Sequence, residues 1–288
     1  RQMCIRDRSV HADEIVSEGL WRRKLGASRT AMLFEREGAK VELGPTLRKL
    51  VTAARFNPSL PYLSFLCINF EAPVVQEAAS WFLDAVFLNY NSSYLERMLE
   101  QMLDEGDSRE VSRFLRAVDV RIDGFRVERA PEWRGQRVFV RHEVDGKAYE
   151  LRLSEESAGT QKLMGLAAYL MTALERGGTV VVDELDAKLH PKLLRYVILL
   201  FKDPGVNKSG AQLIFSSQDV STMRNDVFRR DEIWFAARGE GEASQLWSLA
   251  DIHEANGNLV SKNAAFDKQY LSGRYGADPC LTRIEEWD

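Results

Sequence analysis

The most constraining feature of this 288-residue chain is an alternation of helices and strands in its second half. Residues 161–176 have the apolar spacing of a helix and end at two glycines, after which comes a β-branched run, Thr179–Val182. A second helical segment, residues 191–202, ends at an Asp-Pro-Gly turn and leads to the apolar run Gln212–Phe215. Because parallel strands are joined by crossover helices, this order predicts an α/β fold with a parallel sheet core.

Two carboxylates, Asp183 and Glu184, come directly after the strand predicted at 179–182. Ligands of open α/β sheets bind at the carboxyl ends of the strands, so these side chains are candidates for a site. The layout is that of a Walker B motif, in which the first carboxylate holds Mg²⁺ and the second orients or deprotonates an attacking water. Taken alone, an apolar strand that ends in two acids also arises by chance.

A run of small and hydroxyl residues stands immediately before the helix predicted at 161–176, beginning 26 residues before Asp183. Its sequence is Ser157-Ala158-Gly159-Thr160-Gln161. Such residues at a helix start leave backbone N–H groups open and add O–H donors, which together can bind an anion. The simpler alternative is an N-cap, in which Ser157 or Thr160 ends the helix and nothing is bound.

Two more polar segments are expected near these carboxylates. Asp186 lies in the loop two residues after Glu184, and His190 stands before Pro191, a residue well suited to the first position of a helix. The strand predicted at 212–215 ends in Ser216-Ser217-Gln218-Asp219. Because neighbouring parallel strands end at one edge of a sheet, residues 216–219 should face the same crevice as the two acids.

The order and spacing of these segments resemble the ABC-type ATPase heads of the RecF, SMC and OLD-like group. The closest resemblance is to the bacterial abortive-infection and phage-defence AAA family ATPases of that group. The resemblance is strong over residues 151–281 and weaker over 9–150. The matching segments are residues 157–161 for the signature motif, 180–184 for the Walker B strand, 184–191 for the D-loop and 216–219 for the switch segment.

This resemblance implies a P-loop NTPase fold of the ABC-ATPase-head type, with ATP and Mg²⁺ as cofactors. It makes Glu184 and Gln218 catalytic residues and Asp183 the metal ligand. The residues that it implies in ATP binding are Ser157, Gly159, Thr160, Gln161, Asp186 and His190.

Two departures from the family pattern bear on activity. The switch position, usually His, is Gln218, which can donate a hydrogen bond to a phosphate but carries no positive charge. No Gly-x-x-x-x-Gly-Lys-Ser/Thr loop is present, and the nearest Gly-Lys pair, Gly146-Lys147, stands in a predicted hairpin. In such heads this loop lies near the N-terminus. The chain starts without Met, at RQMCIRDR, so we expect that the sequence is a fragment that lacks the phosphate-binding lobe.

The chain is expected to have three parts: a remnant of an N-terminal β lobe (1–45), a helical insertion (46–118) and an ATPase core (119–288). An antiparallel meander is predicted within 14–43, and the apolar spacing of Val74–Leu88 predicts an amphipathic helix. A helix pair split at Gly106 is expected over residues 92–117, and a C-terminal hairpin and tail end the core. Further strands are predicted at 120–122, at 138–140 and at 149–153, with a turn at Asp145-Gly146.

Composition excludes several classes of protein. Hydrophobic residues make up 45% and charged residues 28% of the chain, which is typical of folded globular proteins and not of disordered or collagen-like ones. Three scattered cysteines are too few for a disulfide framework, and no run reaches the roughly 18–20 apolar residues of a membrane span. We therefore expect a cytoplasmic protein with no membrane partner. Residues 1–55 hold 12 Lys and Arg against 7 Asp and Glu, which fits either a nucleic acid partner or ordinary variation of surface charge.

The resemblance implies that two heads dimerise head to tail, with ATP and Mg²⁺ between Asp183 and Glu184 of one chain and Ser157 and Gly159 of the other. The leading hypothesis is an ATPase of phage defence or abortive infection that couples this homodimer to an effector protein such as a nuclease. The first alternative is a DNA-repair or DNA-clamping head of the RecF or SMC kind. The second is a degenerate module that binds ATP without hydrolysing it.

Overall fold

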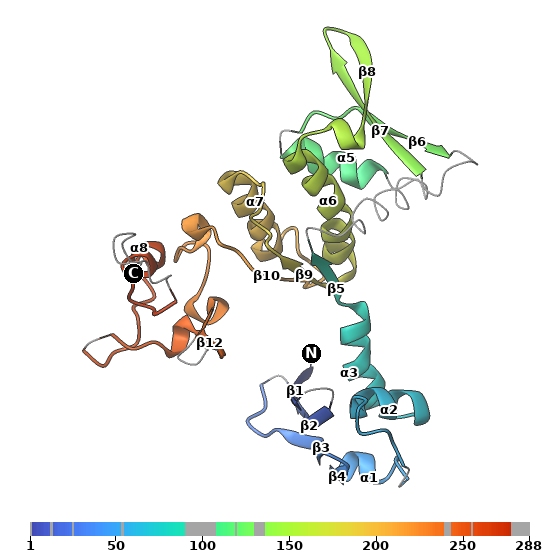
Figure 1. Cartoon of the computed structure of the whole chain (residues 1–288), viewed down its shortest axis with the longest axis vertical. Helices are drawn as coiled ribbons and strands as arrows, with labels where there is room; N and C mark the ends of the chain where they lie inside the picture. The colour runs from blue at the N-terminus through green and yellow to red at the C-terminus, as the bar shows by residue number, and fades with distance from the viewer. Residues whose placement is uncertain are drawn as a thin grey trace, which may run out of the picture. The chain divides into compact units, whose positions relative to one another are not determined.

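In a computed structural model the chain divides into two compact units, Arg1–Ala85 and Val86–Asp288 (Figure 1). The boundary falls inside the predicted segment 46–118, because the residues after Ala85 enter the sheet of the second unit. The assignment of 1–45, 46–118 and 119–288 to parts of an ATPase head stays a prediction. The structure describes residues 2–11, 14–24, 26–52, 55–89, 108–118, 120–129, 136–238, 243–254 and 256–277.

The first unit is built on a four-stranded antiparallel sheet in the order β1-β2-β3-β4. The meander predicted within 14–43 is confirmed, and it is one strand larger because Gln2–His11 pairs with Glu14–Lys24. The first residues of the sequence have no clear periodicity, so this pairing was not predicted. The strands are β1 (Gln2–His11), β2 (Glu14–Lys24), β3 (Ala31–Glu37) and β4 (Lys40–Leu43).

Three helices accompany this sheet, and their apolar side chains share one core with Leu20, Leu33 and Phe34 of the strands. The helix predicted for Val74–Leu88 forms only as far as Asp84. The helices are α1 (Pro45–Arg48), α2 (Tyr62–Asn69) and α3 (Pro73–Asp84).

A buried ion pair joins β2, β3 and the segment before α2. The Nε of Arg36 lies 3.9 Å from Oε2 of Glu18, and both side chains are fully buried. The Arg36 guanidinium donates to the carbonyls of Pro58 (2.6 Å) and Leu60 (2.9 Å), and the Glu18 carboxylate accepts from the N–H of Tyr62 (2.6 Å). The pair therefore ties the start of α2 to the sheet.

The second unit contains the predicted parallel sheet, which is confirmed, with the strand order β10-β9-β5. Its third strand is a correction to the sequence prediction, because residues 86–88 were expected to belong to the helix predicted for Val74–Leu88. Val86 and Leu88 instead pair with Val180 and Val182 of the central strand. The strands are β5 (Val86–Asn89), β9 (Thr179–Asp183) and β10 (Gln212–Phe215).

The crossover helices α6 (Ala158–Arg176) and α7 (Pro191–Lys202) lie beside β9 and β10 (Figure 1). The helix α7 has the predicted bounds, whereas α6 begins at Ala158, three residues before the predicted start. The helix α6 ends before Gly177, whose φ of +84° is the left-handed conformation that glycine tolerates. Apolar residues of α6 and α7 form one core with Val180 and Val182. The core positions the carboxyl edge of the sheet relative to the start of α6.

The opposite face of the parallel sheet carries a row of three apolar residues. Phe87 and Ile214 both pair with Val181, so the three side chains lie on one face. Phe87 is 64% exposed and Ile214 49% exposed. Parallel sheets usually have both faces covered, so this row is a surface that another segment or chain could bury.

An antiparallel sheet of β6, β7 and β8 packs on the same core through Val138 and Val140. The hairpin turn at Asp145-Gly146 is confirmed, and both residues have positive φ, as a type I′ turn requires. The prediction of a strand at 120–122 is wrong, because the strand begins two residues after Ile122, at Gly124. Ile122 is apolar because it is buried in the core, and not because it belongs to a strand. The elements are α5 (Ser108–Ala117), β6 (Gly124–Arg129), β7 (Gln136–Val144), β8 (Lys147–Arg152) and the 3₁₀ turn η1 (Leu153–Glu155). Of the helix pair predicted over 92–117, α5 is observed, and residues 92–107 lie outside the described residues.

The C-terminal part has a small core of its own around Phe235, Leu249 and Phe266. It contains the predicted hairpin, β11 (Trp234–Arg238) with β12 (Ser244–Ser248). Among the described residues, no helix has the length and apolar character needed to cross a membrane. The remaining elements are η2 (Val220–Thr222), η3 (Arg230–Glu232), η4 (Leu249–Asp251) and α8 (Phe266–Leu271).

Candidate functional site

Asp183 and Glu184 lie at the carboxyl edge of the parallel sheet, where Ser216 links them. The Ser216 Oγ donates a hydrogen bond to Oδ1 of Asp183 (2.5 Å) and accepts one from the N–H of Glu184 (2.8 Å). The Ser216 N–H also donates to the carbonyl of Val182 (3.1 Å), because β9 and β10 are parallel neighbours. The structure thus brings the first residue of the 216–219 segment onto the two predicted acids.

The loop that follows β9, residues 184–188, is called here the Glu184 loop. It contains two non-glycine residues with positive φ, Glu184 at +52° and Lys188 at +62°. Each such left-handed residue costs on the order of 1 kcal/mol, so other contacts must hold the loop. One of them is the hydrogen bond from the Leu185 N–H to the Ser216 carbonyl (3.0 Å). The Glu184 side chain itself is exposed.

Asp186 and Gln218, predicted in different roles, are hydrogen-bonded to each other. Oδ2 of Asp186 accepts from the backbone N–H of Gln218 at 3.2 Å. Oδ1 of Asp186 is buried and has no hydrogen-bond partner among the residues that the structure describes. The Gln218 side chain is exposed. Asp186 therefore connects the Glu184 loop to the segment after β10.

The start of α6 has the geometry of an N-cap. The Ser157 Oγ accepts from the N–H of Thr160 (3.1 Å) and lies 2.8 Å from the Thr160 hydroxyl. The Gln161 side-chain amide donates to the Glu156 carbonyl (2.7 Å). Of the two candidates, Ser157 is therefore the N-cap, and the N–H of Thr160 donates a hydrogen bond to it. Anion binding at this helix start stays a prediction.

Gly159 brings the first turn of α6 against the Glu184 loop. A Cβ atom at this position would lie 2.8 Å from the backbone carbonyl oxygen of Lys188, closer than real Cβ atoms come. Only glycine fits this contact without a shift of one backbone or the other. The predicted signature segment and the predicted D-loop are therefore in direct contact within one chain.

Lys162 is a residue of this site that the sequence reasoning missed. Its Nζ donates to the carbonyls of Glu184 (2.6 Å) and Ala187 (2.8 Å), and the residue is only 2% exposed. Burial lowers the pKa of Lys162 to about 8, although the negative charges of Asp186 and Glu184 oppose this change. The available signal was a lysine among the buried apolar positions of a predicted helix.

His190 stands at the start of α7. Its Nδ1 accepts a hydrogen bond from the backbone N–H of Lys192 (3.2 Å), and Pro191 occupies the first helical position. The ring is exposed. The structure therefore gives His190 a capping contact, and its implied part in ATP binding stays a prediction.

The donor set fits Mg²⁺ held together with phosphate. Among the described residues, no group of three or more His, Cys, Asp and Glu could hold a metal, so the chain offers no cage made of protein ligands alone in that part. Mg²⁺ is usually bound through one or two carboxylates plus phosphate oxygens and water, and Asp183 at the sheet edge suits this role. The phosphate-binding loop is not in the sequence. The residues present therefore suit binding of the metal and of a water better than binding of the phosphates.

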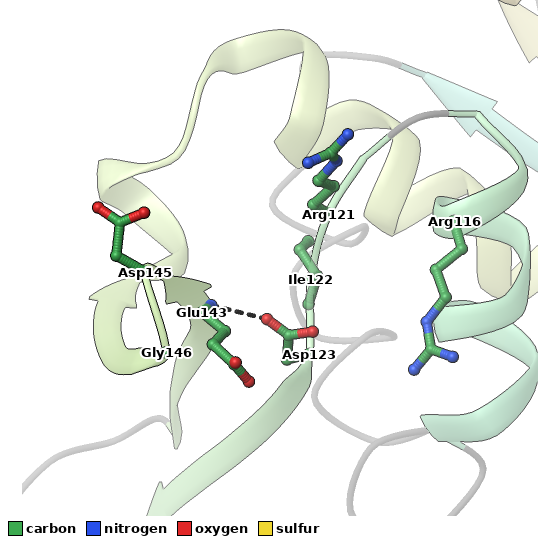
Figure 2. A pocket seen from close by; sticks show the side chains of 7 residues that line it. All are labelled: Arg116, Arg121, Ile122, Asp123, Glu143, Asp145 and Gly146. Carbon is green, nitrogen blue, oxygen red and sulfur yellow. Dashed lines mark hydrogen bonds between the residues drawn. The ribbon is translucent and has the colours of Figure 1, made fainter.

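A separate hollow of about 390 Å³ lies between the end of α5 and the turn joining β7 and β8 (Figure 2). Its charges are mixed, and Oδ2 of Asp123 accepts a hydrogen bond from the N–H of Glu143 (2.7 Å), as Figure 2 shows. None of the predicted site residues lines it. The lining residues are Arg116, Arg121, Ile122, Asp123, Glu143, Asp145 and Gly146.

The parallel sheet and its crossover helices lie within a domain of the AAA class, as a match to a family model shows. A family model described as "AAA domain, putative AbiEii toxin, Type IV TA system" matches residues 58–224, more than half of the chain. The chain belongs to this family, here called the AbiEii-type AAA family. The match includes β5, α6, β9, α7 and β10, and it confirms the resemblance to abortive-infection AAA ATPases.

Among solved structures, the chain is similar to two that are described as belonging to SMC ATPase studies. The SMC head domain from Thermotoga maritima is 13% identical, with 82% of this chain and 74% of that chain covered and a TM-score of 0.40. A chain from a study of ATP-driven dimerization and DNA-stimulated activation of SMC ATPases is 17% identical. That comparison covers 52% of this chain and 88% of the other, with a TM-score of 0.33. No curated protein matches the sequence.

Proposed function

We propose that the chain supplies the metal and water side of an ATP hydrolysis site in an AbiEii-type AAA ATPase. The observation that carries the proposal is the link through Ser216, which holds Asp183 and Glu184 together at the carboxyl edge of the parallel sheet. In this proposal Asp183 binds Mg²⁺, and Glu184 orients or deprotonates the attacking water. When bound, Mg²⁺ neutralises charge on the phosphates.

The contacts around the two acids suit these roles. The hydrogen bond from Ser216 holds the carboxylate of Asp183 in one orientation, which reduces the entropy lost when it binds a metal. The side chain of Glu184 is exposed and can reach a water at the sheet edge. The backbone of Gln218 is held by Asp186 while its exposed amide can donate to a phosphate oxygen. Catalysis would depend on position and charge rather than on covalent chemistry.

In this proposal the phosphate-binding loop belongs to a part of the protein outside these 288 residues. In this proposal that lobe packs on the apolar row of Phe87, Val181 and Ile214 and covers the second face of the parallel sheet. The same lobe would supply the backbone N–H groups and the lysine that bind phosphates in P-loop proteins.

We further propose that two copies of the full-length protein dimerise when ATP binds. Ser157 and Gly159 of one copy would meet the nucleotide held by Asp183 and Glu184 of the other. The dimer would control an effector protein, such as a nuclease, in the cytoplasm. The toxin–antitoxin description of the family supports a role in phage defence or abortive infection.

The test is Glu184→Gln in the full-length protein, which keeps the shape of the side chain and removes the base. We expect ATP to bind with unchanged affinity and kcat to fall at least 100-fold. Glu175→Gln, an exposed change at the far end of α6, is the matched control and should keep full activity. Wild-type turnover by Glu184→Gln would show that the base is another residue.

The same preparation separates the two alternatives. A wild-type protein that dimerises with ATP and shows no turnover would be a non-hydrolysing module. Binding of duplex DNA that weakens steeply with salt would favour a DNA-clamping head, because contacts to phosphates release counterions.

A further inference from the structure

Lys162 is the charged residue of α6 whose side chain reaches the Glu184 loop. It lies on the second turn of the helix, between the predicted signature segment and the apolar core. Its Nζ donates hydrogen bonds to the carbonyls of Glu184 (2.6 Å) and Ala187 (2.8 Å). Both go to backbone atoms, so Lys162 acts on the conformation of the loop.

The loop needs such contacts. Glu184 and Lys188 both have left-handed backbone conformations that side-chain-bearing residues seldom adopt. Ser216 holds the loop from the side of β10 through the N–H groups of Glu184 and Leu185. Lys162 holds it from the side of α6 through two carbonyls. The donors on one side and those on the other together fix the backbone that carries Glu184.

A second contact joins the same two segments. The Cα of Gly159 lies against the carbonyl of Lys188, so the first turn of α6 meets the far end of the loop while Lys162 meets its beginning and middle. Residues 157–162 and 184–188 are therefore connected at both ends of the loop. A displacement of one segment must move the other or break these contacts.

We propose that Lys162 is a positioning residue that couples the start of α6 to Glu184. It touches no substrate: it sets the backbone of the Glu184 loop and passes to Glu184 any movement of the helix start. This inference rests on the proposed function, in which Glu184 acts on water and the start of α6 meets the nucleotide of a second copy.

The first experiment measures the loop itself and needs no catalysis. Amide hydrogen exchange is compared between the 288-residue chain and its Lys162→Met variant, whose side chain has similar length and no charge. We expect exchange at Ala187 and Leu189, whose N–H groups donate to carbonyls within the loop, to be at least tenfold faster in the variant. Lys208→Met, in the turn after α7, is the matched control. If Lys162→Met does not fold, Lys162→Gln, which keeps an N–H donor, takes its place.

The second experiment measures ATP hydrolysis by the full-length protein. Lys162→Met should lower kcat at least tenfold and leave the KM for ATP within threefold, since the residue fixes Glu184 and binds no phosphate. Unchanged exchange at the loop would overturn the inference, as would faster exchange with an unchanged kcat. If exchange rises and the wild-type protein hydrolyses no ATP, the proposed function fails and the role of Lys162 in holding the loop stands.

Discussion

The hydroxyl of Ser216 lies 2.5 Å from Oδ1 of Asp183 and donates a hydrogen bond to it. A carboxylate that accepts such a bond has fewer orientations open to it, and a hydrogen bond to a charged group contributes about 1.5–3 kcal/mol. The Oγ of Ser216 also accepts a hydrogen bond from the N–H of Glu184. One side chain therefore sets the orientation of the candidate metal ligand and the backbone of the candidate base.

Ser216→Ala should lower the kcat of ATP hydrolysis by the full-length protein about tenfold and raise the Mg²⁺ concentration needed for half-maximal activity. The reason is that Asp183 loses its donor and Glu184 loses its acceptor. Ser217→Ala is the matched control, because the Ser217 hydroxyl contacts Asp219 and not the two acids. Equal Mg²⁺ titrations for the two variants would show that the link has no catalytic role.

Gly159→Ala should destabilise the second unit by about 1–3 kcal/mol, the usual cost of forcing extra atoms into a packed site. The added Cβ would lie 2.8 Å from the carbonyl oxygen of Lys188 and must push the Glu184 loop away. The free energy of unfolding in urea measures the effect. Gly205→Ala is the control, since its Cβ would meet only the flexible side chain of Asp203. Equal losses in the two variants would contradict the close packing.

Arg36→Met should destabilise the first unit by roughly 3–5 kcal/mol, because it removes the guanidinium that lies beside the buried carboxylate of Glu18. Arg48→Met removes an exposed partner of Glu42 and should change stability by less than about 1 kcal/mol. Urea unfolding measures both. The double variant Glu18→Met with Arg36→Met should recover part of the loss, since it removes both charges of this pair. If Arg36→Met lost as little stability as Arg48→Met, the buried pair would contribute little to the free energy of unfolding.

Local chemistry in the sequence predicted much of the second unit. The β-branched run before Asp183 predicted β9, and Pro191 and Gly177 marked a helix start and a helix end that the structure contains. These signals work because proline, glycine and β-branched residues restrict the backbone at their own positions. The same reasoning predicted that the 216–219 segment meets the two acids, since the ends of parallel strands share one edge.

The parts that failed depend on partners distant in the chain. Val86–Asn89 becomes a strand only because Val180 and Val182 are available to pair with it, and its own apolar residues fit a helix equally well. Ile122 is buried without being in a strand, because burial and strand pairing are separate requirements. Lys162 gains its role from the carbonyls of a loop beyond the next strand, which no pattern within α6 specifies.

The pH dependence of stability should differ between the wild type and Lys162→Met. Burial lowers the pKa of Lys162 from 10.5 to about 8. The negative charges of Asp186 and Glu184 raise this pKa by less than burial lowers it, and the positive charge of Lys188 also lowers the pKa. Between pH 8 and 10.5 the unfolded chain therefore binds more protons at this lysine than the folded chain does. The contribution of Lys162 to the free energy of unfolding must therefore rise with pH in that window and stay constant below it.

Between pH 8 and pH 9.5 the unfolding free energy of the wild type should rise by about 1.5 kcal/mol relative to that of Lys162→Met. Urea unfolding at several pH values measures it, with the 288-residue chain in each case. Lys162→Arg is the control, because a guanidinium does not lose its proton in this range and its curve should run parallel to that of Lys162→Met. A wild-type curve parallel to both would mean that Lys162 keeps its proton above pH 9.5, and that its contacts with Glu184 and Ala187 offset the cost of burying the charge.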